Sequence, residues 1–176
     1  MRVVGGRFKG TRLFFPKNKF VRPTQDRVKE SVFNILGPIG GLRVLDLFCG
    51  TGGLGIEALS RGAERAVFVD RFDKTIRQNL EKIGIDSPVF ASSVNAFLAG
   101  CDESFDIIFL DPPWNQEALY FDALKRIIEF DILTQGGVVV CEHQESLPIS
   151  DLTDWEMKSD HKYGGTLIKI LKKRDE

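Results

Sequence analysis

The feature that most constrains the fold of this chain is a regular alternation of apolar runs and helical patterns after residue 41. The apolar runs are "LRVLDLF" (42–48), "RAVFVD" (65–70), "SPVFASS" (87–93), "FDIIFLD" (105–111) and "GGVVVCEH" (136–143). The helical patterns between them cover about 53–61, 73–83, 95–99 and 117–130. Strands that are apolar on both faces and separated by helices predict an α/β fold, with a parallel sheet covered on both sides.

The two ends of the chain depart from this alternation. Residues 154–173 predict two strands joined by a turn, so the sheet should have seven strands, mostly parallel, with an antiparallel C-terminal pair. Residues 2–16 predict a β-hairpin, and Thr24 can cap a helix over 25–36. We therefore expect a basic N-terminal hairpin extension over residues 1–21 and one α/β domain over residues 22–176.

The charge of the chain is distributed unevenly, although the net charge is only −1. Residues 1–29 hold nine Lys or Arg and one acid, Asp26, which gives +8. The remainder holds fifteen basic and twenty-four acidic residues, which gives −9. A basic arm on an acidic body indicates a polyanionic partner such as nucleic acid, and the alternative is a solvated terminus.

The composition suits one globular domain of 176 residues. No apolar run approaches the ~20 residues that a membrane span needs, and the N-terminus lacks the apolar core of a signal peptide. We therefore expect a cytoplasmic protein, with a monomer as the default. The three cysteines have no CxxC spacing, so neither a disulfide framework nor a metal site is predicted.

A glycine-rich turn joins the first strand to the next helix in "VLDLFCGTGGLGIEAL" (44–59). Gly50, Gly52 and Gly55 match the G-x-G-x-x-G spacing of nucleotide-binding loops, where backbone approaches the ligand and a helix start offers N–H groups. Asp70 ends the next strand, 18 residues past Gly52, where a carboxylate can bind both hydroxyls of a ribose. The pattern predicts a nucleotide-type cofactor without naming it.

Asp46 narrows the choice of cofactor because it lies just before the glycine loop. A dinucleotide would place its anionic pyrophosphate there, and a carboxylate would repel it. S-adenosylmethionine carries an ammonium and a sulfonium, which Asp46 would attract. The alternative is that Asp46 caps the backbone of the loop.

The second motif, "DPPW" (111–114), directly follows the fourth strand. In an open α/β sheet, ligands bind beyond the carboxyl ends of the strands, near the point where the strand order reverses. Asp111 and the carbonyl of Pro112 can accept the two hydrogens of an exocyclic amine, and Trp114 can stack on the base. The alternative is a tight turn with a capping Asp and a core Trp.

These motifs resemble those of the amino-group methyltransferases of nucleic acids, whose signature is (D/N)PP(Y/F/W). "RVVGGRFKGTRL", "RPTQDRVKESVFNIL", "DLFCGTGGLGIEALSRGA" and "DPPW" together resemble the RsmD family of bacterial 16S rRNA guanine-N2 methyltransferases. The resemblance covers most of the chain and is strongest over residues 1–115. It implies a class I S-adenosylmethionine-dependent, Rossmann-like fold and methylation of guanine 966 in the small ribosomal subunit.

The resemblance also implies roles for individual residues. Contacts to S-adenosylmethionine would come from Asp46, Gly50, Thr51, Gly52, Gly55, Asp70, Ser93 and Val94. The guanine would be held by Asp111, Pro112 and Trp114. The mouth of the site would be lined by Arg22, Thr24 and Arg27. The rRNA phosphates would be bound by Arg7, Lys9 and Arg12. Three residues depart from the family pattern. Ser93 stands where Asp or Asn is frequent, and Phe72 replaces a polar residue that often follows the ribose acid. Trp114 stands where many relatives have Phe or Tyr, a change that preserves stacking.

Three other functions compete with rRNA methylation. A DNA adenine-N6 methyltransferase would use the same four-residue motif on a flipped base, but this length leaves no room for a duplex-reading domain. A dinucleotide oxidoreductase is disfavoured by Asp46 and "DPPW". A non-catalytic RNA-binding module would explain the basic arm but not the two motifs.

Overall fold

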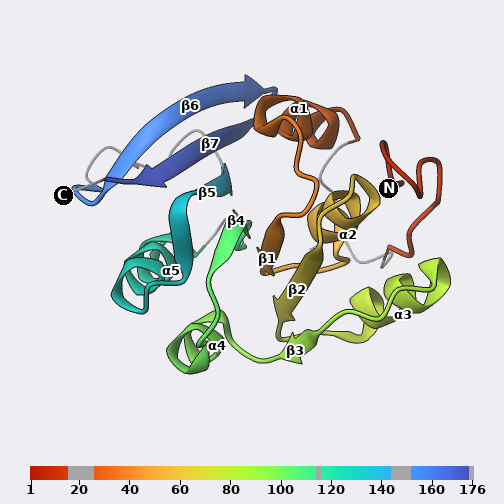
Figure 1. Ribbon diagram of the computed structural model, residues 1–176, viewed down its shortest axis with the longest axis horizontal. Helices are drawn as coiled ribbons and strands as arrows, with labels where there is room; N and C mark the ends of the chain where they lie inside the picture. Colours follow the sequence, from red (N-terminus) through yellow and green to blue (C-terminus); the bar gives the residue numbers. More distant parts are fainter. Residues whose placement is uncertain (16–25, 114–115, 144–151, 175–176) are drawn as a thin grey trace.

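A computed structural model of the chain describes residues 1–15, 26–113, 116–143 and 152–174. Its centre is a seven-stranded sheet in the order β3-β2-β1-β4-β5-β7-β6 (Figure 1). The strands are β1 (Arg43–Leu47), β2 (Arg65–Asp70), β3 (Val89–Ala91), β4 (Phe105–Leu110), β5 (Leu133–His143), β6 (Trp155–Tyr163) and β7 (Thr166–Lys173). The first five are parallel, and β7 runs antiparallel to both β5 and β6. This confirms the predicted sheet with its antiparallel C-terminal pair.

Helices cover both faces of this sheet, as the alternation predicted. One face is covered by α1 (Asp26–Leu36), α2 (Gly53–Ser60) and α3 (Lys74–Ile83), and the other by α4 (Val94–Gly100) and α5 (Ala118–Glu129) (Figure 1). Each layer buries its own apolar cluster against the sheet. The strands between them are buried on both faces, which explains their continuous apolar runs.

The start of β5 differs from the prediction, because the strand begins at Leu133 and not at Gly136. The pairing with β4 shifts register between Phe105, which pairs with Leu133, and Ile107, which pairs with Val138. Gly136 has a φ of +80°, a conformation that favours glycine. The glycine pair at residues 136 and 137 is therefore part of an irregularity inside a longer strand.

The N-terminal arm, residues 1–15, forms two antiparallel segments joined by a single bridge between Arg2 and Arg12. Three backbone hydrogen bonds join the segments: Val3 N–H donates to the Thr11 carbonyl at 2.9 Å, Gly10 N–H to the Val3 carbonyl at 2.9 Å and Leu13 N–H to the Met1 carbonyl at 3.2 Å. No longer ladder forms within the arm. Other backbone groups of the first segment bind α2. The N–H groups of Val4 and Gly5 both donate to the buried carboxylate of Glu57, at 2.8 and 2.7 Å.

The same Glu57 carboxylate is part of a buried charge cluster beneath the arm. Lys29 of α1 is fully buried, its Nζ lies 3.7 Å from Glu57 Oε2, and it donates to the Arg2 carbonyl. Burial lowers the pKa of Lys29, while the charge of Glu57 opposes that shift. The arm is therefore bound to α1 and α2 through buried polar contacts. The predicted boundary at residues 21 and 22 lies outside the described residues, so the division into extension and domain stays a proposal.

Candidate active site

The carboxyl ends of three neighbouring strands bring the two sequence motifs together. Leu47 of β1 pairs with Val69 of β2 on one side and with Leu110 of β4 on the other. Asp70 and Asp111 each follow one of these partners, so they lie level with each other on the two sides of β1. Two strand spacings separate them by about 10 Å. The strand order reverses between β1 and β4, which is the switch point where α/β sheets bind ligands.

Asp46 lies in β1, just before the glycine loop, and is buried, with 2% of its surface exposed. Its Oδ2 accepts a hydrogen bond from Gly55 N–H at 2.8 Å. Burial raises the pKa of Asp46 to about 7, the charge of Asp70 adds to that shift, and the Gly55 hydrogen bond opposes it. The structure thus shows the capping role that was the alternative in the sequence, and direct contact with a cofactor cation stays a prediction.

Gly55 is required by close packing between α2 and the sheet. A methyl group at Gly55 would lie 2.4 Å from Phe68 Cε1 and 3.0 Å from Asp46 Oδ2. Gly52 has a φ of +77°, and a methyl group there would lie 2.0 Å from Ile76 Cδ1. These glycines let the loop lie tightly between β1, β2 and α3.

Asp70 connects the glycine loop to the turn after β2. Its Oδ2 accepts from Gly50 N–H at 2.9 Å, and its Oδ1 accepts from Phe72 N–H at 2.9 Å. Each carboxylate oxygen has more than one lone pair, so both can still accept a hydroxyl hydrogen. Asp70 is half-buried, in the position expected for a residue that binds a ribose.

Asn79 of α3 is a site residue that the sequence reasoning missed. Its fully buried side chain donates to the Thr51 carbonyl at 2.9 Å and to the Phe14 carbonyl at 3.1 Å, and accepts from Phe14 N–H at 2.6 Å. Thr51 Oγ1 also lies 3.6 Å from Met1 Sδ. The glycine loop and both segments of the arm therefore share one set of contacts. The only sequence signal was a polar residue at a buried position of an amphipathic helix.

Phe48 was also not among the predicted site residues. It has a φ of +57° although it is not glycine, and its residue type gave no signal of that conformation. It lies where β1 leaves the sheet, between the ends of β2 and β4. The next residue, Cys49, donates its N–H to the Val69 carbonyl at 3.1 Å, which fixes the exit of the loop. Backbone in this region of φ is uncommon and is concentrated at functional sites.

The Asp-Pro-Pro turn follows β4 directly, as the sequence predicted. Asp111 is half-buried, Pro112 is buried and Pro113 is exposed. The Pro113 carbonyl accepts from Gln116 N–H at 3.0 Å and so leads the chain toward α5. Trp114 lies outside the described residues, so its stacking role stays a prediction.

Tyr120 packs behind this turn and was not among the predicted site residues. Its side chain is buried, and within the described chain its hydroxyl has no hydrogen-bond partner. The ring lies edge-on to His143, with centroids 6.2 Å apart. Burial raises the pKa of Tyr120, and the charge of Asp111 adds to the shift, so a neutral phenol lies next to the turn.

Ser93 and Val94 lie at the start of α4, beyond the end of β3. The Ser93 hydroxyl accepts from Ala96 N–H at 3.2 Å and caps the helix, and Val94 is buried. The Asp70 carbonyl accepts from Ser92 N–H at 3.1 Å, which places this segment beside Asp70. Contact with an adenine is compatible with that position and remains a prediction.

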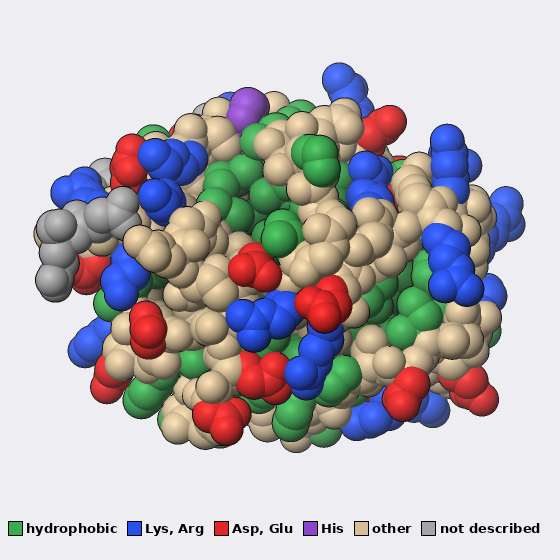
Figure 2. All heavy atoms as spheres, viewed as in Figure 1, with side chains coloured by type: hydrophobic (Ala, Val, Ile, Leu, Met, Phe, Trp, Pro, Cys, Tyr) green, Lys and Arg blue, Asp and Glu red, His purple; other side chains and the backbone are tan. Residues whose placement is uncertain are grey.

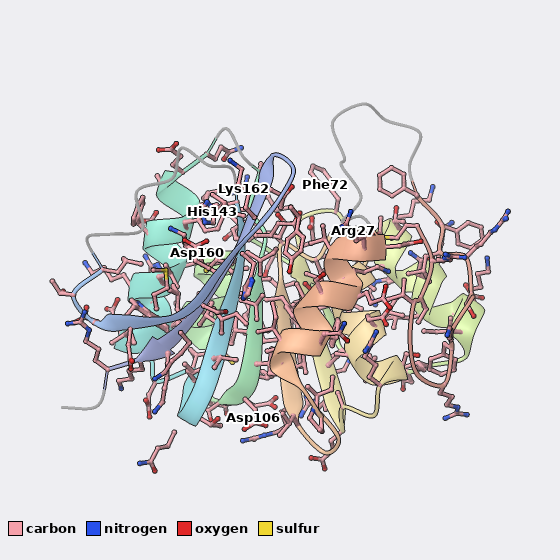
Figure 3. The ribbon with its side chains drawn as sticks, turned by 90° about the horizontal axis from the view of Figure 1, so that it is seen from above. Arg27, Phe72, Asp106, His143, Asp160 and Lys162 are labelled. Carbon is pink, nitrogen blue, oxygen red and sulfur yellow. The ribbon has the colours of Figure 1, made fainter. Side chains whose placement is uncertain are left out.

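The predicted RNA-binding residues lie partly within the described structure, and their role stays a prediction. Arg27 is exposed at the start of α1, at the same end of the sheet as Phe72 and His143 and opposite Asp106 (Figure 3). Arg22 and Thr24 lie outside the described residues. In the arm, the side chains of Arg7, Lys9 and Arg12 are exposed.

The residues at this edge fit S-adenosylmethionine better than a dinucleotide. Carboxylates border the loop on both sides, and the start of α2 brings backbone N–H groups to it. No group of three or more potential metal ligands occurs in the described ranges. Two carboxylates, those of Asp46 and Asp70, bind the backbone of the loop, and such groups attract a cationic ligand and repel an anionic pyrophosphate. Separately, no described helix is long and apolar enough to cross a membrane.

Strand order, covering helices and the glycine loop define a class I, Rossmann-like methyltransferase fold. A solved structure titled "Putative methyltransferase yhhF from Escherichia coli" has the same fold, with a TM-score of 0.87 and 27% identity over 100% of this chain and 99% of that one. The family model described as "Conserved hypothetical protein 95" matches residues 1–172.

Two relatives are similar over nearly the whole chain. The Bacillus subtilis protein named "Putative rRNA methyltransferase YlbH" is 40% identical, covering 99% of this chain and 100% of that protein. "Ribosomal RNA small subunit methyltransferase D" of Haemophilus influenzae is 32% identical, covering 93% of this chain and 89% of that protein. The chain therefore belongs to the RsmD family of methyltransferases, as its motifs predicted.

Proposed function

We propose that this chain transfers a methyl group from S-adenosylmethionine to the exocyclic N2 amine of a guanine, of the guanine 966 type, in 16S rRNA of the small ribosomal subunit. The observation that carries the proposal is the position of Asp111. Its turn follows β4, next to the β1 loop that holds the cofactor motif. The names of the relatives support an rRNA substrate, and the choice of guanine N2 rests on the resemblance of the motifs.

The cofactor half of the site would be formed by the glycine loop and Asp70. When bound, S-adenosylmethionine supplies an electrophilic methyl group. Asp70 would accept hydrogen bonds from the ribose hydroxyls, and Asp46 would balance the positive charge through the loop that it caps. Gly50, Thr51, Gly52 and Gly55 would shape the loop around the cofactor, while Ser93 and Val94 would lie beside its adenine.

The target half would be formed by Asp111, Pro112 and Trp114. Asp111 and the Pro112 carbonyl would accept the two N–H hydrogens of the amine and hold its nitrogen lone pair toward the methyl group. Trp114 would stack on the guanine. The amine can lose its extra proton to water after transfer, so this scheme assigns no residue as a general base.

The experiment that tests this function is methyl transfer from labelled S-adenosylmethionine. Small subunits that lack the modification, protein-free 16S rRNA and duplex DNA would be offered in parallel, and the labelled nucleoside identified. N2-methylguanosine from rRNA is the expected product, and the preferred RNA form would show when in assembly the enzyme acts. N6-methyladenine from DNA, or no transfer to any substrate, would contradict the proposal.

A further inference from the structure

Phe72 is the most exposed large apolar side chain in the described part of the protein. It is 82% exposed, against 50% for Phe14, 45% for Phe90 and 53% for Met157. Phe90 is explained by a tilted contact with Phe97, with centroids 4.9 Å apart. Exposed aromatic rings on a fixed backbone are suited to binding, because little conformational freedom is lost when a partner stacks on them.

The backbone of Phe72 is fixed by the candidate site itself. Its N–H donates to Asp70 Oδ1 at 2.9 Å, while the other oxygen of that carboxylate binds Gly50 of the glycine loop. Figure 3 shows Phe72 at the same end of the sheet as Arg27. The ring therefore lies in solvent beside the mouth of the site.

Phe14, at the end of the arm, has a similar arrangement. Asn79 holds its backbone through hydrogen bonds to both N–H and carbonyl. Lys82 Nζ lies 4.7 Å from the centroid of the Phe14 ring and also donates to the Arg12 carbonyl at 2.6 Å. Half of the side chain stays exposed, so a fixed aromatic ring and a cation lie together on the surface.

The surface that carries these two rings is basic. Residues 71–83 contain Arg71, Lys74, Arg77 and Lys82 against two acids, one of which, Asp73, pairs with Arg77. The arm adds Arg7, Lys9 and Arg12, while its Arg2 pairs with Asp26 of α1. Figure 2 shows Lys and Arg side chains gathered on the right of the view, where Figure 1 places the arm and α3. Elsewhere on that face, acidic and basic side chains are interspersed.

We propose that Phe72 and Phe14 are stacking platforms for unpaired bases of a single-stranded RNA segment that flanks the target nucleotide. This inference rests on the proposed function. Cations along the surface bind the phosphates, and each ring offers a face to a base. A duplex would present only its backbone here, because its base faces are already stacked. The surface thus selects an unpaired region of RNA.

The test compares Phe72→Ala and Phe14→Ala with Met157→Ala on β6, which lies at the far edge of the sheet from α3 (Figure 1). Binding of a short labelled single-stranded RNA and of its duplex would be measured across salt concentrations, with affinity for S-adenosylhomocysteine measured in parallel. We expect each Phe→Ala change to weaken single-strand binding roughly 5- to 150-fold. Met157→Ala should bind single-stranded RNA as the wild type does. In the two Phe→Ala variants, affinity for the duplex and the salt slope should stay unchanged. Phe72→Trp should retain affinity for the single strand.

Several results would overturn the inference. Single-strand affinity within about twofold of wild type in Phe72→Ala would show that the ring does not contact RNA. A loss of S-adenosylhomocysteine affinity alone would assign the ring to the cofactor. Equal weakening of single strand and duplex would exclude base stacking. If one of these contrary results is found and the wild-type chain still methylates RNA, only the inference about the two rings fails. A wild-type chain that methylates no RNA overturns the proposed function as well.

Discussion

The two halves of the candidate site are built differently. In the cofactor half, three polar groups hold the loop: Asp46 binds Gly55, Asp70 binds Gly50, and Asn79 binds Thr51. In the target half, two prolines fix the turn and leave the half-buried Asp111 at its start. The cofactor loop is therefore preorganised by long-range hydrogen bonds, whereas the target turn is preorganised mainly by restricted backbone angles.

The largest expected effect is on the target half. Asp111→Ala removes the acceptor that we assign to the amine, so methyl transfer should fall by about 10²- to 10³-fold or more. Affinity for S-adenosylmethionine, measured by calorimetry, should stay close to wild type, because the cofactor loop keeps its own contacts. Asp102→Ala, an exposed acid that precedes β4 and so lies at the opposite end of that strand from Asp111, is the control. Full activity in Asp111→Ala would contradict the amine-binding role.

The arm should affect binding of the substrate and leave cofactor affinity unchanged. Reversal of Arg7, Lys9 and Arg12 to Glu should weaken RNA binding and reduce the salt slope by about 0.7 for each phosphate that is no longer neutralised. The three side chains are exposed, so the fold should persist. Fluorescence anisotropy at several salt concentrations measures both quantities. An unchanged affinity and slope would mean that the arm is structural only.

A methyl group at Gly55, in the first turn of α2, should have a smaller effect, and that effect should be on stability and cofactor binding. Gly55→Ala would place Cβ 2.4 Å from Phe68 and 3.0 Å from Asp46. Overpacking of this kind destabilises by about 1–3 kcal/mol, and here it should also weaken cofactor binding. Gly40→Ala is a matched control, because nothing lies within 4 Å of its added Cβ and its φ is ordinary. Equal thermal stability of the two variants would contradict the packing argument.

The smallest expected effect is a pH dependence that originates at Asp46. Its carboxyl has a pKa of about 7 in the folded protein against 3.8 ordinarily, so a proton is bound below about pH 7. A cationic ligand favours the ionised form, so binding should release this proton. Affinity for S-adenosylmethionine should therefore rise with pH by at most about tenfold per unit, and level off above about pH 7.

Calorimetry over this range, with Asp46→Asn as control, would check the assignment. The amide oxygen of Asn can still accept from Gly55 N–H, while the titration is lost. The same shift lowers the stability of the free protein: its free energy of unfolding should fall as pH rises from 3.8 to about 7, because the unfolded carboxyl ionises first. A pH profile of affinity that persists in Asp46→Asn would assign the titration to another group.

Patterns within short stretches of the chain were enough to predict the elements and the motifs at their ends. The parallel sheet, the glycine loop and the Asp-Pro-Pro turn follow from hydrophobic period and turn residues, because each depends on positions close together in the sequence. The contacts that join these parts could not be predicted in this way. Those of Asn79 with Phe14 and Thr51 span 65 and 28 residues, and those of Glu57 with the arm span more than 50. No local spacing encodes such pairs, so only the packed fold shows that the arm and the cofactor loop share contacts.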